Sequence, residues 1–146
     1  MKKRDEYLEL KKRHQKEFED FPIAYAFNDK QLQEALEKLG ATKEEVITVF
    51  GHGDIVKREN VKPLIALLER HEQELHQKLR DDIDFAEAAI FYEMGNHEYA
   101  INYDGDADVL SCFGITFEDI CEWGLQLAWE SARNKHFKYM ENCGVI

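Results

Sequence analysis

The sequence has neither lysine nor arginine between Asp81 and Ala132. This 52-residue stretch contains thirteen carboxylates and no lysine or arginine. The first 80 residues carry equal numbers of acidic and basic side chains, and residues 133–146 have a net charge of +2, so this one stretch accounts for the net charge of −11. A charge bias of this kind lowers affinity for nucleic acid and anionic membranes and favours partners with a basic surface.

Other absences narrow the class of protein further. No apolar run approaches the roughly 18 residues that a membrane-spanning helix needs, so no membrane segment is expected. The basic residues after Met1 are not followed by an apolar segment, so no signal peptide is expected. There are three cysteines, an odd number without CxxC spacing, which predicts free thiols in a reducing cytoplasm.

The composition is that of a folded protein. Hydrophobic residues make up 44% of the 146 residues and include nine Phe, six Tyr and two Trp, which is too many for a disordered acidic tail. Only two prolines and eight glycines are present, which favours regular structure with short connections. We predict a single acidic α+β domain over residues 1–146.

Apolar residues recur every three or four positions in five segments, each predicted to be helical. These are residues 3–20, a segment from an Asn28 cap to Gly40, a segment from an Asn60 cap to Leu79, a segment that restarts after Asp81–Asp84 and ends at Gly95, and a long C-terminal helix from a Thr116 cap to about Asn142. Residues 109–113 are expected to form one further helical turn that Gly114 ends.

Four short segments rich in β-branched and aromatic residues are predicted strands: residues 23–27, 46–50, 55–58 and 98–103. Gly51-His52-Gly53-Asp54 separates the second and third, which predicts a hairpin. Because strands occur singly or as a hairpin, we predict a small antiparallel sheet of about four strands packed with about five helices, rather than a Rossmann-type sheet.

Three motifs resemble known sites but lack their spacing. His71 and His76 are five residues apart on a predicted helix, whereas a zinc protease needs four, so His71 is expected to pack and His76 to be solvated. The run from Asp104 to Asp108 lacks the glycine and glutamate of a calcium loop. Gly51–Asp54 lacks the length of a phosphate loop. Cys112 and Cys121 are expected to fill core.

Asn96-His97-Glu98 is an alternative candidate site. A histidine and a glutamate at the end of a helix can perform acid–base chemistry or bind a metal, which would make the protein a small metal-assisted enzyme. The structural interpretation is that Asn96 simply ends the helix. A third alternative is a non-catalytic assembly protein.

The carboxylates of the lysine-free stretch form three clusters, which we predict to be the partner-binding residues. Carboxylates at helix N-termini complement the helix dipole, which explains part of the pattern but not the absence of compensating cations. The clusters are cluster A (Asp81, Asp82, Asp84 and Glu87), cluster B (Asp104, Asp106 and Asp108) and cluster C (Glu118, Asp119 and Glu122).

Four segments together resemble a family of short uncharacterised proteins from Gram-positive bacteria, their phages and mobile elements. The segments are residues 21–27, 51–58, 70–72 and 96–101. The resemblance implies a setting in which small acidic proteins antagonise host defence, including anti-CRISPR proteins, and it implies no catalytic residue. We therefore expect a non-enzymatic inhibitor without cofactor or bound metal. Its acidic surface would occupy the nucleic-acid groove of a basic effector, such as the CRISPR nuclease Cas9.

Overall fold

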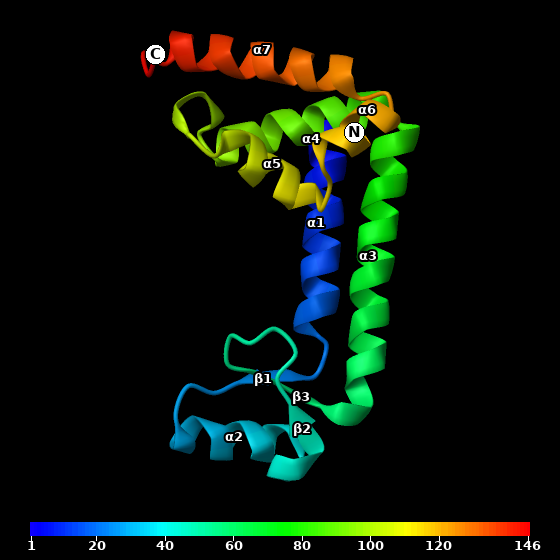
Figure 1. Ribbon diagram of the computed structural model, residues 1–146, viewed down its shortest axis with the longest axis vertical. Coiled ribbons are helices and arrows are strands. Elements are labelled where there is room, and N and C mark those ends of the chain that lie inside the picture. The colour runs from blue at the N-terminus through cyan, green and yellow to red at the C-terminus, as the bar shows by residue number, and fades with distance from the viewer. The chain divides into compact units, whose positions relative to one another are not determined.

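The computed structural model describes all of residues 1–146 and contains seven α-helices and one three-stranded antiparallel sheet (Figure 1). The helices are α1 (Lys3–Glu19), α2 (Asp29–Leu39), α3 (Val61–Asp81), α4 (Ile83–Asn96), α5 (Gly105–Phe113), α6 (Phe117–Glu122) and α7 (Gln126–Asn142). The strands are β1 (Ile23–Tyr25), β2 (Val46–Ile47) and β3 (Asp54–Lys57), and 3₁₀ turns lie at η1 (Lys43–Glu45), η2 (Arg58–Asn60) and η3 (Tyr99–Ile101). The predicted α+β class is confirmed, whereas the predicted number of strands is wrong by one.

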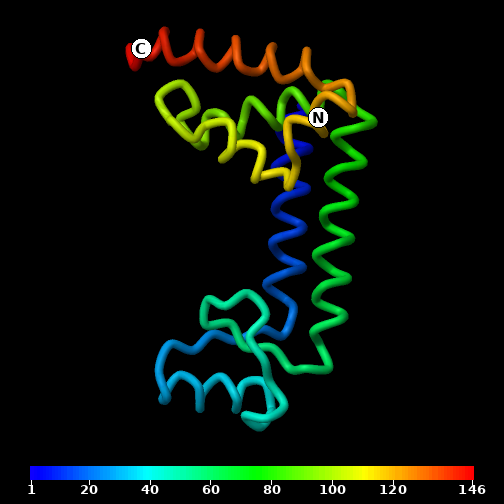
Figure 2. Tube along the Cα trace, viewed as in Figure 1, coloured from blue at the N-terminus to red at the C-terminus, as the bar shows by residue number.

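The chain folds into two compact units, whose path can be followed in Figure 2. Unit 1 contains Met1–Lys12 and Glu72–Ile146, and unit 2 contains Arg13–His71. The boundaries between them fall inside α1 and inside α3. Unit 1 carries nine of the eleven net negative charges, so the acidic character belongs mainly to one unit.

Helix α4 is the centre of unit 1 and packs against α5 and α7. Its sequence is apolar on several sides, as expected for a helix covered by more than one neighbour; Phe85, Ala89 and Met94 are all fully buried. The Tyr7 ring of α1 meets the Phe85 ring edge-on, with centroids 5.9 Å apart. Helices α4 and α7 begin at the same end of the unit and run in the same direction, while α5 runs the opposite way (Figure 1).

Unit 2 is built on the sheet, whose strand order is β1-β3-β2. Strands β2 and β3 form the predicted hairpin, with Ile47 opposite Val56. The loop between them wraps around Asp54, a fully buried carboxylate that accepts hydrogen bonds from the backbone N–H groups of Val49 (2.8 Å), Phe50 (3.0 Å) and His52 (3.2 Å). These donors explain the acidic residue after Gly53: Asp54 supplies the acceptor that holds the loop closed.

Two predicted elements differ from the structure. Residues 98–103 are not a strand but contain η3, because Glu98 adopts a left-handed conformation (φ 49°) that turns the chain back after α4. The single C-terminal helix is instead α6 and α7, since Gly124 has a φ of 68° that an α-helix cannot contain. No helix combines the length and apolarity needed to cross a membrane.

Candidate functional site

Cluster A lies where α3 ends and α4 begins, and half of it is used internally. Asp82 caps α4 by accepting from the Phe85 N–H at 3.0 Å, and Lys3 donates to it at 2.8 Å. Glu87 pairs with Lys135 and accepts from the Ser131 hydroxyl at 2.6 Å. The hydrogen bonds from Lys3 and Lys135 hold the pKa values of Asp82 and Glu87 below their ordinary range. The remaining members, Asp81 and Asp84, are exposed and form no ion pair.

Cluster C lies on the short helix α6. Asp119 closes a capping box with Thr116: its carboxylate accepts from the Thr116 N–H at 2.9 Å, and the Thr116 hydroxyl accepts from the Asp119 N–H. Glu118 and Glu122 are exposed and form no ion pair. The sequence pattern therefore predicted this cap correctly. Two carboxylates of cluster C remain without an ion pair.

Cluster B begins α5 and is largely tied to local structure. Asp106 accepts a hydrogen bond from the Tyr99 hydroxyl, and Asp108 accepts from the Asn102 amide at 2.8 Å. Asp104 is exposed. Carboxylates in the first turn of α5 also complement its dipole. This cluster therefore has a sufficient structural explanation.

The segments that carry clusters A and C meet through two neighbouring residues, whereas cluster B lies elsewhere in unit 1. The Arg80 guanidinium, next to cluster A, lies 5.4 Å from the ring centre of Trp123, next to cluster C. Trp123, which follows α6, also packs against His76 of α3, and Figure 1 shows that α5 begins near the other end of α4. Since α4 has 14 residues, its two ends are about 21 Å apart. We call the four unpaired carboxylates of clusters A and C the acidic end: Asp81, Asp84, Glu118 and Glu122.

The aromatic residues near these clusters differ in exposure. Tyr103 is fully exposed, whereas the Tyr99 ring packs edge-on against Trp129, with centroids 6.2 Å apart. Trp123 is partly buried against the hydrophobic core of unit 1 and holds the Arg80 guanidinium. Trp123 is thus the aromatic residue that joins the segments carrying clusters A and C.

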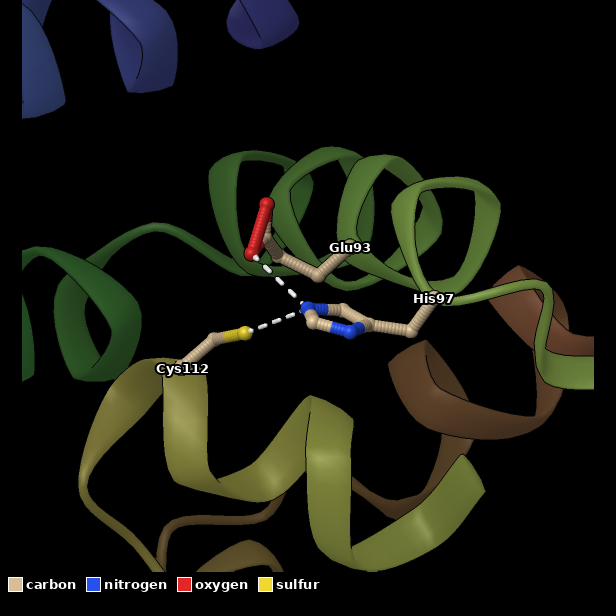
Figure 3. Close-up of side chains that lie close together, drawn as sticks. All are labelled: Glu93, His97 and Cys112. Atoms are coloured by element: carbon tan, nitrogen blue, oxygen red, sulfur yellow. Dashed lines mark hydrogen bonds and ion pairs between the residues drawn. The ribbon is translucent and has the colours of Figure 1, made fainter. Parts of the chain in front are cut away.

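His97, the alternative candidate, lies in a second polar group of unit 1 (Figure 3). Its Nε2 is 3.1 Å from the Cys112 sulfur and 4.0 Å from a Glu93 carboxylate oxygen. Glu93 and His97 come from the end of α4, and Cys112 comes from the last turn of α5. Glu98, its predicted partner, is exposed and not in this group.

Burial and the neighbouring Glu93 carboxylate raise the pKa of Cys112 to about 12. A nucleophilic cysteine needs the opposite, a thiol that ionises readily at neutral pH. Both Glu93 and Cys112 also approach the same ring nitrogen of His97, whereas a catalytic triad places them at opposite nitrogens. This group is therefore unsuited to cysteine nucleophilic chemistry.

The structure tests the expectations for the other histidines and cysteines. His71 packs as predicted, with its ring stacked on His14 at a centroid distance of 4.0 Å. The prediction that His76 is solvated is wrong: its ring lies against Trp123, and its Nε2 is 2.7 Å from the carbonyl oxygen of Phe113. The prediction that Cys121 fills the core is also wrong, because Cys121 is exposed.

The sequence did not identify Glu93 and Cys112 as candidate site residues. Glu93 and His97 stand four residues apart, a spacing that places two side chains on the same face of a helix and that was available as a signal. Cys112 gave no such signal, because its approach to His97 depends on how α5 packs on α4.

A family model described as "Family of unknown function (DUF7659)" matches residues 6–135. The chain belongs to this family. The matched region includes the acidic end and the group formed by Glu93, His97 and Cys112. The expectation of an uncharacterised family is confirmed, and no activity is attached to it. No curated protein and no solved structure matches the chain.

Proposed function

We propose that the protein is a non-enzymatic inhibitor that binds a basic, nucleic-acid-processing protein through the acidic end of unit 1. The observation that supports the proposal is the contact of Arg80, next to cluster A, with Trp123, next to cluster C, in segments that carry four exposed carboxylates without an ion pair. Cluster B, beyond the other end of α4, is not part of the proposed surface.

Nearby cations reduce the charge of this surface but do not cancel it. Lys3 neutralises Asp82 and Lys135 neutralises Glu87, while Arg80 lies over Trp123. Asp81, Asp84, Glu118 and Glu122 remain without an ion pair, and no lysine or arginine occurs between residues 81 and 132. Carboxylates spaced along a surface can take the place of phosphates among the lysines and arginines of a nucleic-acid groove.

The partner we propose is an effector of bacterial defence, such as a CRISPR nuclease. These enzymes hold nucleic acid in positively charged channels and recognise its backbone through lysine and arginine. The resemblance to proteins of phages and mobile elements supports this setting. Because the interaction would be mainly electrostatic and solvent-exposed, its affinity is expected to fall as salt is added.

The first prediction concerns the location of the charges. The triple variant Asp84→Asn, Glu118→Gln, Glu122→Gln is expected to bind a guide-loaded CRISPR nuclease at least about 10-fold more weakly, because charge at the acidic end provides the attraction. Binding is measured by calorimetry at low and at raised salt, together with competition by target DNA.

A matched control removes the same number of charges elsewhere in unit 1. The triple variant Glu98→Gln, Asp104→Asn, Glu141→Gln changes three exposed carboxylates that lie outside clusters A and C. It is expected to retain affinity within a few-fold. Equal losses in both variants, or an affinity unaffected by salt, would contradict the proposed surface.

A further inference from the structure

We infer that Glu93, His97 and Cys112 form a binding site for one divalent transition-metal ion of the zinc class. The three residues offer three ligand atoms, a carboxylate oxygen, the imidazole Nε2 and the thiol sulfur, that all lie within 4.8 Å of one another (Figure 3). They come from two helices that pack together in unit 1, so the site is held by the fold rather than by a loop. This inference is independent of the acidic end.

The spacing fits a tetrahedral centre. Zinc bonds of about 2.05 Å to nitrogen and about 2.3 Å to sulfur place those two ligand atoms about 3.6 Å apart, and nitrogen and oxygen about 3.4 Å apart. The corresponding distances are 3.1 Å between His97 and Cys112 and 4.0 Å between His97 and Glu93. One is slightly short and the other slightly long, each by about half an ångström. The sulfur and the carboxylate oxygen lie within 4.8 Å of each other, against about 3.6 Å in a tetrahedral centre, so side-chain shifts would complete the geometry.

Neighbouring residues hold the carboxylate in the orientation that a metal would need. Lys11 donates to Glu93 Oε1 at 3.2 Å, and the Asn96 amide donates to the same oxygen at 3.3 Å. The other oxygen, Oε2, is the one that faces His97. Glu93 is almost fully buried, so this orientation is also fixed by packing. Such contacts from outside the ligand set commonly orient ligands in metal sites.

The chemistry of binding is proton exchange. In the absence of metal, the Cys112 thiol donates to the Asp108 carbonyl oxygen at 3.3 Å, and its sulfur lies 3.1 Å from His97 Nε2. A bound ion takes the place of the thiol proton, a metal–sulfur bond forms, and one proton is released to solvent. His97 remains 36% exposed, which gives an ion access from solvent and leaves the fourth coordination position open to water.

The ligand set also selects the class of ion. Thiolate and imidazole favour zinc, cobalt or copper, whereas magnesium and calcium prefer oxygen ligands alone. Only one oxygen ligand is present in this group. The expected order of affinity is therefore zinc above cobalt, with no specific binding of magnesium.

The test uses cobalt(II) as a spectroscopic probe on the full chain after removal of metals with a chelator. We expect one equivalent to bind with the absorption bands of a tetrahedral cobalt thiolate, and zinc to displace it. Calorimetry of zinc binding in buffers of different ionisation enthalpy is expected to show release of about one proton. Zinc is also expected to raise the thermal midpoint.

Loss of a residue that only orients a ligand typically weakens metal binding by roughly 10–100-fold. The variants Cys112→Ser and His97→Asn each remove a ligand, so each is expected to weaken zinc binding by more than that. The matched controls Cys121→Ser and His52→Asn change an exposed cysteine and an exposed histidine outside the group and should bind as the parent does. Circular dichroism confirms that each variant is folded. Cobalt that binds without thiolate bands, equal affinity in Cys112→Ser and Cys121→Ser, or no saturable binding would overturn the inference.

Discussion

Replacing Asp54 with alanine is expected to destabilise unit 2 by about 2–4 kcal/mol, because three backbone N–H groups lose their acceptor at once. Those donors, on Val49, Phe50 and His52, are arranged around a carboxylate that has no solvent exposure. Each buried donor without a partner costs about 1–3 kcal/mol. Water that reaches the partly exposed loop can accept from some of these N–H groups, so the total for three donors is lower than the sum of the three separate costs. Asp54→Asn should cost less, because its amide keeps one acceptor oxygen.

Amide hydrogen exchange of β3 and α2 measures this effect, since both elements belong to unit 2. The matched control is Asp29→Asn, an exposed aspartate in the first turn of α2, which should cost no more than about 1 kcal/mol. If Asp54→Ala lost no more protection than Asp29→Asn, the N–H contacts would not be what holds the loop.

The same carboxylate gives unit 2 a predicted pH dependence. Burial by itself would raise the pKa of Asp54, but the N–H groups of Phe50, Val49 and His52 outweigh it and hold the pKa below the ordinary value of 3.8. The unfolded chain therefore binds the proton more readily, so this contribution to stability is complete above about pH 4 and is lost as the pH falls below it. Asp54→Asn should remove this part of the pH dependence, and equal acid profiles for variant and parent would contradict it.

Replacing Phe85 with alanine is expected to lower the free energy of unfolding of unit 1 by about 3–5 kcal/mol. Phe85 has no solvent exposure and packs with Tyr7 of α1 in the largest hydrophobic cluster. Truncation of the ring removes its burial and leaves a cavity that the surrounding helices can fill only in part. The loss is therefore larger than burial alone would give.

Tryptophan fluorescence reports this change specifically, because Trp123 and Trp129 are the only tryptophans and both lie in unit 1. The denaturant midpoint followed by fluorescence should fall for Phe85→Ala. The matched control is Ile83→Ala, two residues earlier in α4, where the side chain is 51% exposed. It should change the free energy of unfolding by less than about 1 kcal/mol, because little of its surface is buried. Equal midpoints for the two variants would show that the α4 core is not packed as described.

Several elements were predictable because their causes are local. Asn28 accepts a hydrogen bond from Gln31 and Gly40 ends α2 in a left-handed conformation, as the cap pattern indicates. The break between α3 and α4 follows from Asp82, whose side chain caps α4. The predicted strand at residues 98–103 failed because β-branched and aromatic residues also suit packing on a helix, and the Tyr99 ring packs on α7 instead.

The sequence by itself determined the charge of this protein, its helix caps, its hairpin and its α+β class, because each depends on composition or on residues a few positions apart. Only the tertiary structure decided which charged and polar groups meet. It brought Arg80 to Trp123, paired Asp82 with Lys3, and brought Cys112 to His97 and Glu93. These contacts join distant parts of the chain, and the packing of whole helices, rather than any local pattern, sets their distances.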